Sequence, residues 1–341
     1  MWPTLRSIIF RPTSVASNPI RSTARQLHST TNPLLNQESS QSNTSSSFNN
    51  TTASNATVSP EEIKHFNSLA STWWDESGGF GLLHRMNPIR TQFIRERILY
   101  DVTPQSSLKL ESPLNPNRFL SGQKVLDVGC GGGIFSEVLS RLGGDVLGID
   151  AAAASIKVAS SHASNDSKLN FQHEAQLEDL PNQENRLRYR HCSVEDLLKE
   201  DDQQELYDVV CAMEVIEHVE DPHAFLTGLA KLTKPGGHLI LSTISRTPLA
   251  RLLTIYLAES NLPFIGLVPP GTHTYEKFVK PEELTDFFRN RLGWAKSFER
   301  SELETRGSFY EPLTGHWNLF PREFVLGELV NYFFGVKKPL N

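Results

Sequence analysis

The segment that most constrains the fold of this chain is an apolar run that ends in a cluster of glycines and continues into a helix-like pattern. Residues 124–128 (Lys-Val-Leu-Asp-Val) read as a short buried strand, residues 129–133 are Gly-Cys-Gly-Gly-Gly, and residues 134–142 have helical apolar spacing. A strand, a glycine-rich turn and a helix in this order are typical of the first unit of a doubly wound α/β sheet. The loop then lies at the carboxyl end of the strand, where such sheets bind ligands.

Further segments repeat the alternation of strand and helix. Residues 145–150, 207–211 and 238–242 read as buried strands separated by helical segments. Residues 234–237 (Lys-Pro-Gly-Gly) predict a tight turn that leads into the last of these strands. The sequence therefore predicts a doubly wound, mostly parallel α/β sheet.

An acidic residue at the end of the second predicted strand indicates what the loop binds. Asp150 follows Gly129 by 21 residues (150 − 129), about the interval at which a carboxylate meets the two ribose hydroxyls of a nucleoside cofactor. A dinucleotide fingerprint would need glycine at position 134, where this chain has Ile134. The segment instead resembles the first motif of the class I S-adenosylmethionine (SAM) methyltransferases. The alternative left open is a glycine-rich turn in an NAD-binding or ligand-free α/β domain.

Composition narrows the possible compartments and partners. The chain has 341 residues, 3 cysteines and a net charge of −6. The cysteines form no Cys-x-x-Cys pair, which argues against a disulfide framework or a structural zinc site. Without an overall basic charge, nucleic acid is not expected as a partner. No run of about 18 apolar residues predicts a membrane-spanning helix.

The first 60 residues differ from the rest. They contain four arginines and one acid, Glu38, so they carry +3 (4 − 1) while the remainder carries −9 (−6 − 3). Arginine, serine and scattered apolar residues without acids are typical of a mitochondrial transit peptide, predicted over residues 1–33, with a basic disordered tail as the alternative. Residues 34–59 are rich in serine, threonine and asparagine and predict a disordered linker. The folded domain is predicted over residues 60–338.

Two local patterns lie at the start of this domain. Ser59-Pro60-Glu61-Glu62 predicts a capping box, in which Ser59 and Glu62 stabilise the start of a helix at about Pro60. Asn87-Pro88 predicts a turn, and residues 103–122 predict a connector before the first strand.

Five segments together resemble the ubiquinone-biosynthesis O-methyltransferase family, and its mitochondrial form most closely. In chain order they are residues 71–75 (STWWD), 83–90 (LHRMNPIR), 125–134, 213–219 (MEVIEHV) and 269–281, which begins PPGTH. The resemblance runs from about residue 60 to the 330s. The chain departs from the family in a polar insertion at 165–190, a longer connector at 103–122 and Tyr310-Glu311-Pro312 in place of Tyr-Asn-Pro.

The resemblance implies an enzyme that transfers the methyl group of SAM to catechol-type hydroxyls of polyprenylated benzenoid intermediates. Two steps of ubiquinone biosynthesis are implied, on 3,4-dihydroxy-5-polyprenylbenzoate and on demethylubiquinol. The resemblance also implies a peripheral protein on the matrix side of the mitochondrial inner membrane, associated with other subunits of a ubiquinone-biosynthesis complex. Two alternatives stay open: a noncatalytic SAM-binding subunit of such a complex, and a related methyltransferase with a different acceptor.

Three polar side chains after the fourth strand are candidates for the chemistry. A phenol must lose a proton whose pKa is about 10 before it attacks the methyl group. On a helix, Glu214, Glu217 and His218 would share one face, and they are the predicted ligands of a divalent cation that lowers the pKa of the catechol. The resemblance implies magnesium, although an imidazole ligand suits zinc, manganese or iron at least as well. The alternative is an acidic helix start with a structural histidine.

Glu217 and His218 are therefore the predicted catalytic residues. Without a cation, His218 becomes the preferred general base. His273, which follows Gly-Thr in a predicted loop, is second in line.

The predicted cofactor contacts surround the glycine loop. They are Arg90, Gly129, Gly131, Asp150, Val194 and Met213, with the backbone of Ser193 next to Val194. The resemblance assigns Arg90 to the cofactor carboxylate, which a guanidinium can bind through two hydrogen bonds; an ordinary surface arginine is the alternative. Cys130 has no evident activator and is predicted to pack rather than to react.

A polyprenyl substrate needs an apolar path to the site. The leucine-rich stretch from Leu249 to Val268, in a predicted lid or membrane-facing insertion at 249–276, is too interrupted by charges and proline to cross a bilayer. With Arg246 and Arg251, it is predicted to lie on an anionic membrane surface, and core packing is the equally weighted alternative. Deletion of residues 249–268 is expected to abolish liposome association and to leave cofactor affinity unchanged.

Overall fold

The computed structural model describes residues 57–101, 115, 117–173, 185–260, 267–297 and 299–340. The predicted transit peptide at 1–33 lies outside these residues, as do all but the last three residues of the predicted linker at 34–59. Parts of the connector at 103–122 and of the insertion at 165–190 also lie outside them.

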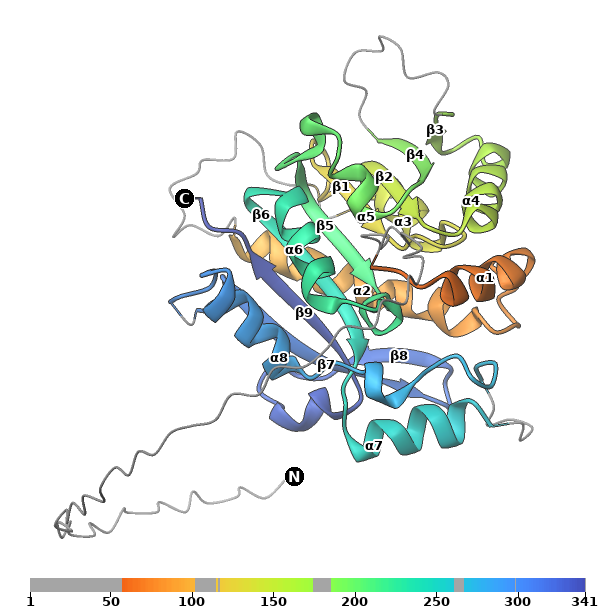
Figure 1. The fold of residues 1–341 in the computed structure, drawn as a ribbon, viewed down its shortest axis with the longest axis vertical. Coiled ribbons are helices and arrows are strands. Elements are labelled where there is room, and N and C mark those ends of the chain that lie inside the picture. Colours follow the sequence, from red (N-terminus) through yellow and green to blue (C-terminus); the bar gives the residue numbers. More distant parts are fainter. Residues whose placement is uncertain are drawn as a thin grey trace, which may run out of the picture. The chain divides into compact units, whose positions relative to one another are not determined.

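Nine strands of the described residues form one sheet in the order β3-β4-β2-β1-β5-β6-β9-β7-β8 (Figure 1). The strands from β3 to β6 pair in parallel, and β9, β7 and β8 extend the sheet in antiparallel fashion. The prediction of a mostly parallel α/β sheet is confirmed. The strands are β1 (Lys124–Val128), β2 (Asp145–Asp150), β3 (Asn170–Phe171), β4 (Arg186–His191), β5 (Tyr207–Met213), β6 (Thr233–Ile244), β7 (Leu303–Glu311), β8 (His316–Leu319) and β9 (Asn331–Lys337).

Helices cover both faces of this sheet. Successive side chains of a strand point to opposite faces, so Val125 packs in an apolar cluster with α2, α3 and α4, whereas Leu126 packs in a second cluster with α5, α6 and α8. The α-helices are α1 (Pro60–Leu69), α2 (Gly81–Asp101), α3 (Ile134–Arg141), α4 (Ala153–Asn165), α5 (Val194–Leu197), α6 (Pro222–Leu232), α7 (Pro248–Ala250) and α8 (Pro281–Asp286). The 3₁₀ and π turns are η1 (Ala70–Thr72), η3 (Asp201–Gln203), η4 (Ile216–His218), η5 (Arg251–Ala258), η6 (Tyr275–Lys277), η7 (Phe287–Arg291) and η8 (Val325–Leu329).

Strand β6 is longer than predicted, because residues on both sides of the predicted turn pair with β5. The register between the two strands shifts between Tyr207 and Val209, and the residues at 234–237 form the bulge that absorbs the shift. Gly236 in this bulge has a φ of 79°, which favours glycine.

The turn predicted at Asn87-Pro88 is wrong, because α2 runs through Pro88. Proline removes one backbone hydrogen bond from a helix interior and disfavours the helix there. Met86, Ile89 and Phe93 of the same helix are buried against the sheet. Their burial outweighs the local cost of the proline.

Helix α1 begins at Pro60, as predicted, and Oγ of Ser59 accepts a hydrogen bond from the backbone N–H of Glu62 at 3.1 Å. The carboxylate of Glu62 is directed elsewhere, with Oε2 lying 3.3 Å from Nδ1 of His218. Within the described residues, only one half of the predicted capping box is therefore present.

The predicted lid forms α7 and η5. Ala250 and Thr254 are buried, but the large apolar side chains of the same turns expose 37–57% of their surface, and these are Leu249, Leu252, Leu253, Tyr256 and Leu257. The alternative in which this stretch packs into the core is therefore wrong for these five side chains, whereas Ile255 packs, partly buried, against a core cluster.

Candidate active site

A cavity of about 870 Å³ opens at the carboxyl ends of β1, β2 and β5. Gly129, Asp150 and Met213 lie at these three strand ends and line the cavity, together with side chains from α1, α2, α7 and η5. Ligands of α/β sheets bind outside the carboxyl ends of the strands. The structure therefore has a ligand-sized space where the sequence predicts one.

The glycine loop is shaped by backbone conformation and by close packing. Gly129, Gly131 and Gly133 have φ values of 68°, 55° and 83°, which favour glycine. Gly129 lines the cavity. Gly131 faces the ring of Trp73 instead, and a Cβ atom there would lie 2.5 Å from that ring. The absence of a side chain at Gly131 thus makes room for Trp73.

Asp150, at the end of β2, binds the glycine loop through a hydrogen bond. Its Oδ2 accepts a hydrogen bond from the backbone N–H of Gly131 at 2.9 Å, and its Oδ1 accepts one from the N–H of Ala152 at 2.7 Å. Burial raises the pKa of Asp150, while these backbone hydrogen bonds act in the opposite direction. The carboxylate is therefore held at the edge of the cavity, where a ribose can reach it.

Arg90 is not the surface arginine of the alternative interpretation, because only 3% of it is exposed. Its Nη1 donates to Oδ1 of Asn87 at 3.2 Å, and its guanidinium lies over the ring of Phe135 at 5.5 Å. Its Nε has no partner among the described residues. Burial lowers the pKa of Arg90, against the opposing charges of Glu214 and Asp127. A buried cation that lines a cavity is suited to bind an anionic group.

Two carboxylates lie close enough to Arg90 to influence it. Asp127 accepts a hydrogen bond from Oγ of Ser136 at 2.6 Å, and burial raises its pKa to about 6 although Ser136 and Arg90 oppose the shift. Glu214 has a left-handed backbone with a φ of 57°, and its buried Oε1 has no partner among the described residues. A left-handed glutamate is uncommon and marks a position that the surrounding structure enforces.

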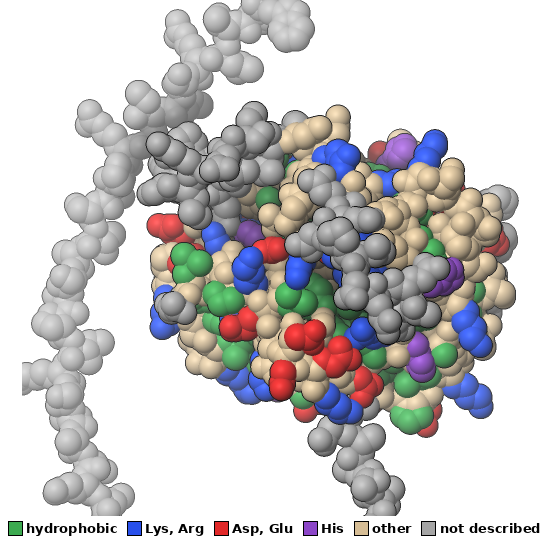
Figure 2. Space-filling model, turned by 90° about the horizontal axis from the view of Figure 1, so that it is seen from above, with side chains coloured by type: hydrophobic (Ala, Val, Ile, Leu, Met, Phe, Trp, Pro, Cys, Tyr) green, Lys and Arg blue, Asp and Glu red, His purple; other side chains and the backbone are tan. Residues whose placement is uncertain are grey.

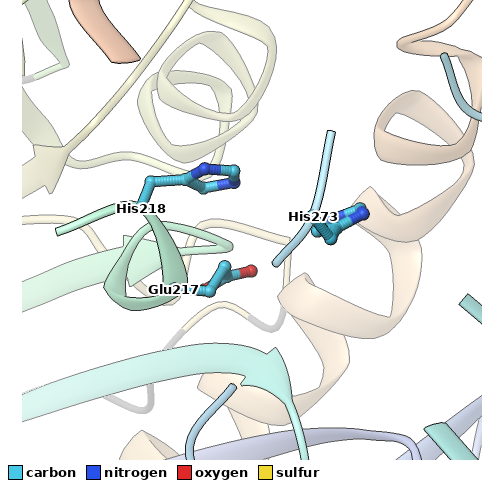
Figure 3. Close-up of side chains that lie close together, drawn as sticks. All are labelled: Glu217, His218 and His273. Atoms are coloured by element: carbon cyan, nitrogen blue, oxygen red, sulfur yellow. The ribbon is translucent and has the colours of Figure 1, made fainter. Parts of the chain in front are cut away.

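The helix predicted to carry Glu214, Glu217 and His218 on one face is wrong. Ile216–His218 is a single 3₁₀ turn, η4, and Glu214 precedes it in a left-handed conformation. Glu217 and His218 instead approach His273, and one ligand atom from each of these three side chains lies within 4.8 Å of the others (Figure 3). The residue that completes the group comes from a distant loop.

Glu217 is the buried member of this group, with 3% of its surface exposed. Its Oε2 accepts a hydrogen bond from Oγ1 of Thr243 at 2.8 Å, whereas its buried Oε1 has no partner among the described residues. Burial, followed by repulsion from Glu214, raises the pKa of Glu217 to about 8. An unpaired buried oxygen of this kind can accept a proton or bind a cation.

Each histidine of the group touches a further carboxylate that the sequence did not reveal. Nδ1 of His218 lies 3.3 Å from Oε2 of Glu62, and Nδ1 of His273 lies 2.7 Å from Oε1 of Glu259. The motif at residues 59–62 drew attention to Glu62 only as a helix cap. Glu259 carried no signal beyond its charge in an apolar stretch.

The remaining predicted contacts lie at the cavity as well. Val194, at the start of α5, and Met213 are buried and line it. Ser193 lines it too, but its backbone N–H already donates to Asp196 at 3.3 Å. Cys130 is buried, and burial raises the pKa of its thiol well above the usual value, which agrees with a packing role.

A protein-family model described as "Methyltransferase domain" matches residues 100–295 of this chain. These residues span the parallel part of the sheet from β1 to β6 and the glycine loop.

Curated proteins of similar sequence carry a more specific name. "Ubiquinone biosynthesis O-methyltransferase, mitochondrial" of Schizosaccharomyces pombe is 42% identical over 288 residues, which cover 84% of this chain and 89% of that protein. The mouse protein of the same name is 39% identical over 78% of this chain and 63% of its own length. "Ubiquinone biosynthesis O-methyltransferase" of Psychrobacter cryohalolentis is 38% identical over 85% of this chain and 98% of that protein.

Proposed function

This chain belongs to the ubiquinone biosynthesis O-methyltransferase family, and from that membership we propose that it methylates catechol-type hydroxyls of polyprenylated benzenoid intermediates with SAM as the donor. Two substrates are proposed, 3,4-dihydroxy-5-polyprenylbenzoate and demethylubiquinol. The observation that carries the proposal is that one cavity is lined both by the strand-end residues Asp150 and Met213 and by His218 and His273. A methyl donor and an acceptor base can therefore meet in the same space.

Five residues are proposed to hold SAM. Asp150 would bind the ribose hydroxyls, and Arg90 would bind the carboxylate of the methionine part. Met213 and Val194 would contact the remaining parts of the cofactor, together with the backbone of Gly129. The unpartnered Nε of Arg90 fits this assignment, because a buried cation without an ion pair gains most from an anionic ligand. Gly131 would not contact SAM itself; its lack of a side chain leaves room for the ring of Trp73 beside the loop.

A divalent cation is proposed at Glu217, His218 and His273, with Glu214 close enough to influence Glu217. The unpartnered Oε1 of Glu217 fits such a role. One carboxylate and two imidazoles suit manganese, iron or zinc better than magnesium, which prefers oxygen ligands. When bound, SAM supplies a methyl group on a positively charged sulfur, and the cation supplies Lewis-acid stabilisation of the catecholate.

The chain's own residues supply the acid–base step. A phenolic hydroxyl keeps its proton at neutral pH, because its pKa is about 10. A ring nitrogen of His218, or the carboxylate of Glu217, would accept this proton as the phenolate forms. Burial of Glu217 and of most of the His218 side chain also excludes water, which strengthens each polar contact around the reacting oxygen.

The proposal is tested by following methyl transfer from labelled SAM to a catechol with a short prenyl tail. Glu217→Ala is expected to lower kcat by about 100-fold or more, because general-base catalysis contributes effects of that size. Glu282→Ala, at an exposed acid of α8, serves as the control and is expected to retain full activity.

The outcomes separate the possible functions. Loss of activity with a chelator, restored by manganese, supports the cation; unchanged activity removes the cation and leaves His218 as the base. SAM binding in a calorimeter without transfer to any catechol would indicate a noncatalytic subunit. Transfer to a carbon or amine acceptor alone would indicate a related methyltransferase.

The proposed location is the matrix side of the mitochondrial inner membrane. The names of the relatives support the mitochondrion. Within the described residues, no helix has the length and apolar character needed to span a bilayer. Leu249 of α7 and Leu253 and Leu257 of η5 line the cavity on one side. Leu326 and Leu329 of η8 line it as well. These two walls are proposed as the path of the polyprenyl tail and as the surface that contacts the membrane.

The two arginines beside this surface, Arg246 and Arg251, already contact other side chains of the protein. Arg246 contacts Glu283, and Arg251 lies over the rings of Tyr256 and Tyr275. Membrane contact is therefore proposed to rest chiefly on apolar side chains, with less electrostatic attraction than the sequence suggested.

Residues 1–33 remain proposed as a mitochondrial transit peptide. Association with other subunits of a biosynthetic complex is also proposed, because the family resemblance implies it.

A further inference from the structure

Two histidines of the active-site group are each paired with a carboxylate from a different element. We infer that Glu62 and Glu259 are positioning residues, which hold the proton of His218 and of His273 on Nδ1 and leave Nε2 as the nitrogen with the free lone pair. This inference rests on the proposed function, because the free nitrogen is the one that would accept a phenolic proton or bind a cation.

The first pair joins α1 to η4. Oε2 of Glu62 lies 3.3 Å from Nδ1 of His218, and 12% and 21% of the His218 and Glu62 side chains are exposed. The ring of Phe66, one turn further along α1, meets the His218 ring edge-on at 5.2 Å. Lys277 lies 3.5 Å from the other oxygen of Glu62. The imidazole is therefore bounded by an acceptor and an apolar ring of the same helix.

The start of α1 is itself fastened beside η4. The backbone of Val58 forms an antiparallel bridge with Val219, and the N–H of Glu220 donates to the carbonyl of Thr57 at 2.6 Å. The cap at Ser59 then fixes the direction of the helix. These contacts place Glu62 next to His218 by backbone geometry, so the pairing does not depend on a mobile side chain alone.

The second pair is more deeply buried. Glu259 is 6% exposed, and its Oε1 lies 2.7 Å from Nδ1 of His273 and accepts the backbone N–H of the same residue at 3.0 Å. Its Oε2 accepts the N–H of Gly271 at 2.8 Å. A carboxylate with both oxygens occupied by donors is fixed in orientation, and it fixes the loop that carries His273.

The consequence for chemistry follows from the two ring nitrogens. A neutral imidazole has one N–H and one lone pair, and a carboxylate beside Nδ1 keeps the proton there. Nε2 then carries the lone pair. Without the carboxylate, part of the population would hold the proton on Nε2 and could neither accept a phenolic proton nor bind a cation there. Partners of this kind typically change metal affinity or activity by 10–100-fold.

The test reads the tautomer directly, in the full chain with ¹⁵N-labelled histidine, by two-bond ¹H–¹⁵N spectra at pH 8. His218→Asn and His273→Asn assign the two rings. The wild type is expected to show both rings with the proton on Nδ1. Glu62→Ala is expected to move His218 toward the Nε2-protonated form and to raise the dissociation constant for Mn²⁺ by roughly 10–100-fold.

Matched variants control the result. Glu61→Ala removes an exposed acid from the neighbouring position of α1 and is expected to leave the spectrum and Mn²⁺ binding unchanged. Glu62→Gln keeps an oxygen acceptor and is expected to restore part of the wild-type tautomer. Glu259→Gln, which retains one acceptor for the loop, is expected to affect His273 alone.

A His218 ring that keeps its proton on Nδ1 in Glu62→Ala would overturn the inference, as would a wild-type ring with the proton on Nε2. Neither result depends on catalysis. If the wild-type tautomers are as inferred but the enzyme transfers no methyl group to a catechol, the proposed function fails and the positioning role of the carboxylates stands.

Discussion

Arg90 shows how a single buried residue can reveal a ligand. The chain buries its guanidinium beside Phe135 and gives it one amide oxygen as partner. Burial of a charge without a paired opposite charge destabilises the folded protein. Such an arrangement is tolerated where the missing partner arrives with a ligand, and the carboxylate of SAM is the partner proposed here.

Replacing Arg90 should therefore lower the affinity for SAM without lowering the stability of the folded protein. Arg90→Met is expected to raise the dissociation constant for SAM by about 100-fold, because hydrogen bonds to charged groups contribute about 1.5–3 kcal/mol each. Without SAM, its thermal midpoint is expected to equal or exceed that of the wild type, because for Arg90 the cost of burial exceeds the attraction of Glu214 and Asp127. Calorimetric titration and thermal unfolding measure the two effects.

The matched control is Arg95→Met on the same helix, at a partly exposed position. It is expected to leave SAM affinity unchanged. A large drop in stability for Arg90→Met without any loss of SAM affinity would show that Arg90 is a structural residue.

Asp127 gives the folded state a dependence on pH. Burial raises its pKa from 3.8 to about 6. Because the folded pKa exceeds the unfolded one, the stability from protonated Asp127 is complete below pH 3.8 and is lost as the pH rises through 6. The loss amounts to about 3 kcal/mol at pH 8, from 1.36 kcal/mol per pKa unit.

Asp127→Asn removes this ionisation and keeps an oxygen to accept the hydrogen bond of Ser136. The difference in unfolding free energy, variant minus wild type, is expected to increase by about 2.5 kcal/mol between pH 4 and pH 8, with most of the increase between pH 4 and pH 6. Urea unfolding at a series of pH values measures it. Parallel pH profiles for the two proteins would contradict the prediction.

At the scale of elements, local sequence patterns correctly predicted several strands and helix starts that local interactions determine. The strand, glycine loop and helix at 124–142, and the helix start at Pro60, follow from burial periodicity and capping, and the structure confirms them. The helix predicted at 214–218 is wrong, because a helical spacing of polar residues does not determine the backbone conformation after the end of a strand. Glu214 turns left-handed there, and only one 3₁₀ turn follows.

The packing of Trp73 on the glycine loop also leaves no sequence signal, yet it makes a sharp prediction. The Gly131 position combines a φ of 55° with a ring atom 2.5 Å from any added Cβ. Gly131→Ala is expected to reduce the unfolding free energy by about 3 kcal/mol, the sum of backbone strain and overpacking. Urea unfolding measures the change.

Gly122 supplies the control for strain alone, because its φ is 78° and an added Cβ would meet nothing within 4 Å. Gly122→Ala is expected to lower the unfolding free energy by only about 1 kcal/mol. Equal losses at the two glycines would mean that the ring of Trp73 moves aside at little cost.

At the scale of the whole molecule, contacts between distant segments decide the site. His273 reaches Glu217 across 56 residues (273 − 217), Glu259 pairs with His273, and Glu62 reaches His218 across 156 residues. Periodicity and spacing cannot predict such pairs, because they depend on how the elements pack. The sequence therefore located the strand-end residues that line the cavity but missed the carboxylates behind the histidines.

The molecule's surface bears on how it would reach a lipid substrate. On the face shown in Figure 2, positive and negative side chains are interspersed, and the net charge of the chain is −6. The negative net charge makes long-range attraction to an anionic membrane weak, so the proposed membrane contact relies on the exposed apolar side chains of η5.

Leu252→Glu combined with Tyr256→Glu tests this surface without deleting it. These side chains are 50% and 57% exposed, so the fold is expected to tolerate the change. Liposome partitioning is expected to fall by about 100-fold, since each apolar side chain contributes about 1.5–3 kcal/mol when buried. SAM affinity, measured by calorimetry, is expected to stay the same.

Leu340→Glu provides the comparison, because Leu340 is 69% exposed and lies against Gly236, in the bulge near the start of β6. Liposome partitioning of this variant is expected to match that of the wild type. Equal losses in the two variants would mean that lipid binding is unspecific and not a property of η5.

Strand β9 is the last strand of the described residues along the chain, yet it lies in the interior of the sheet, between β6 and β7. A ribosome therefore completes the parallel strands and the β7–β8 hairpin before the strand that joins them exists. A premature stop codon ahead of Asn331 would leave β6 with an open edge and the hairpin with nothing to pair with, even though each residue of the methyl-transfer site had been made. Truncating mutations ahead of Asn331 should thus be as damaging as those within the parallel strands, through aggregation of the unfinished polypeptide.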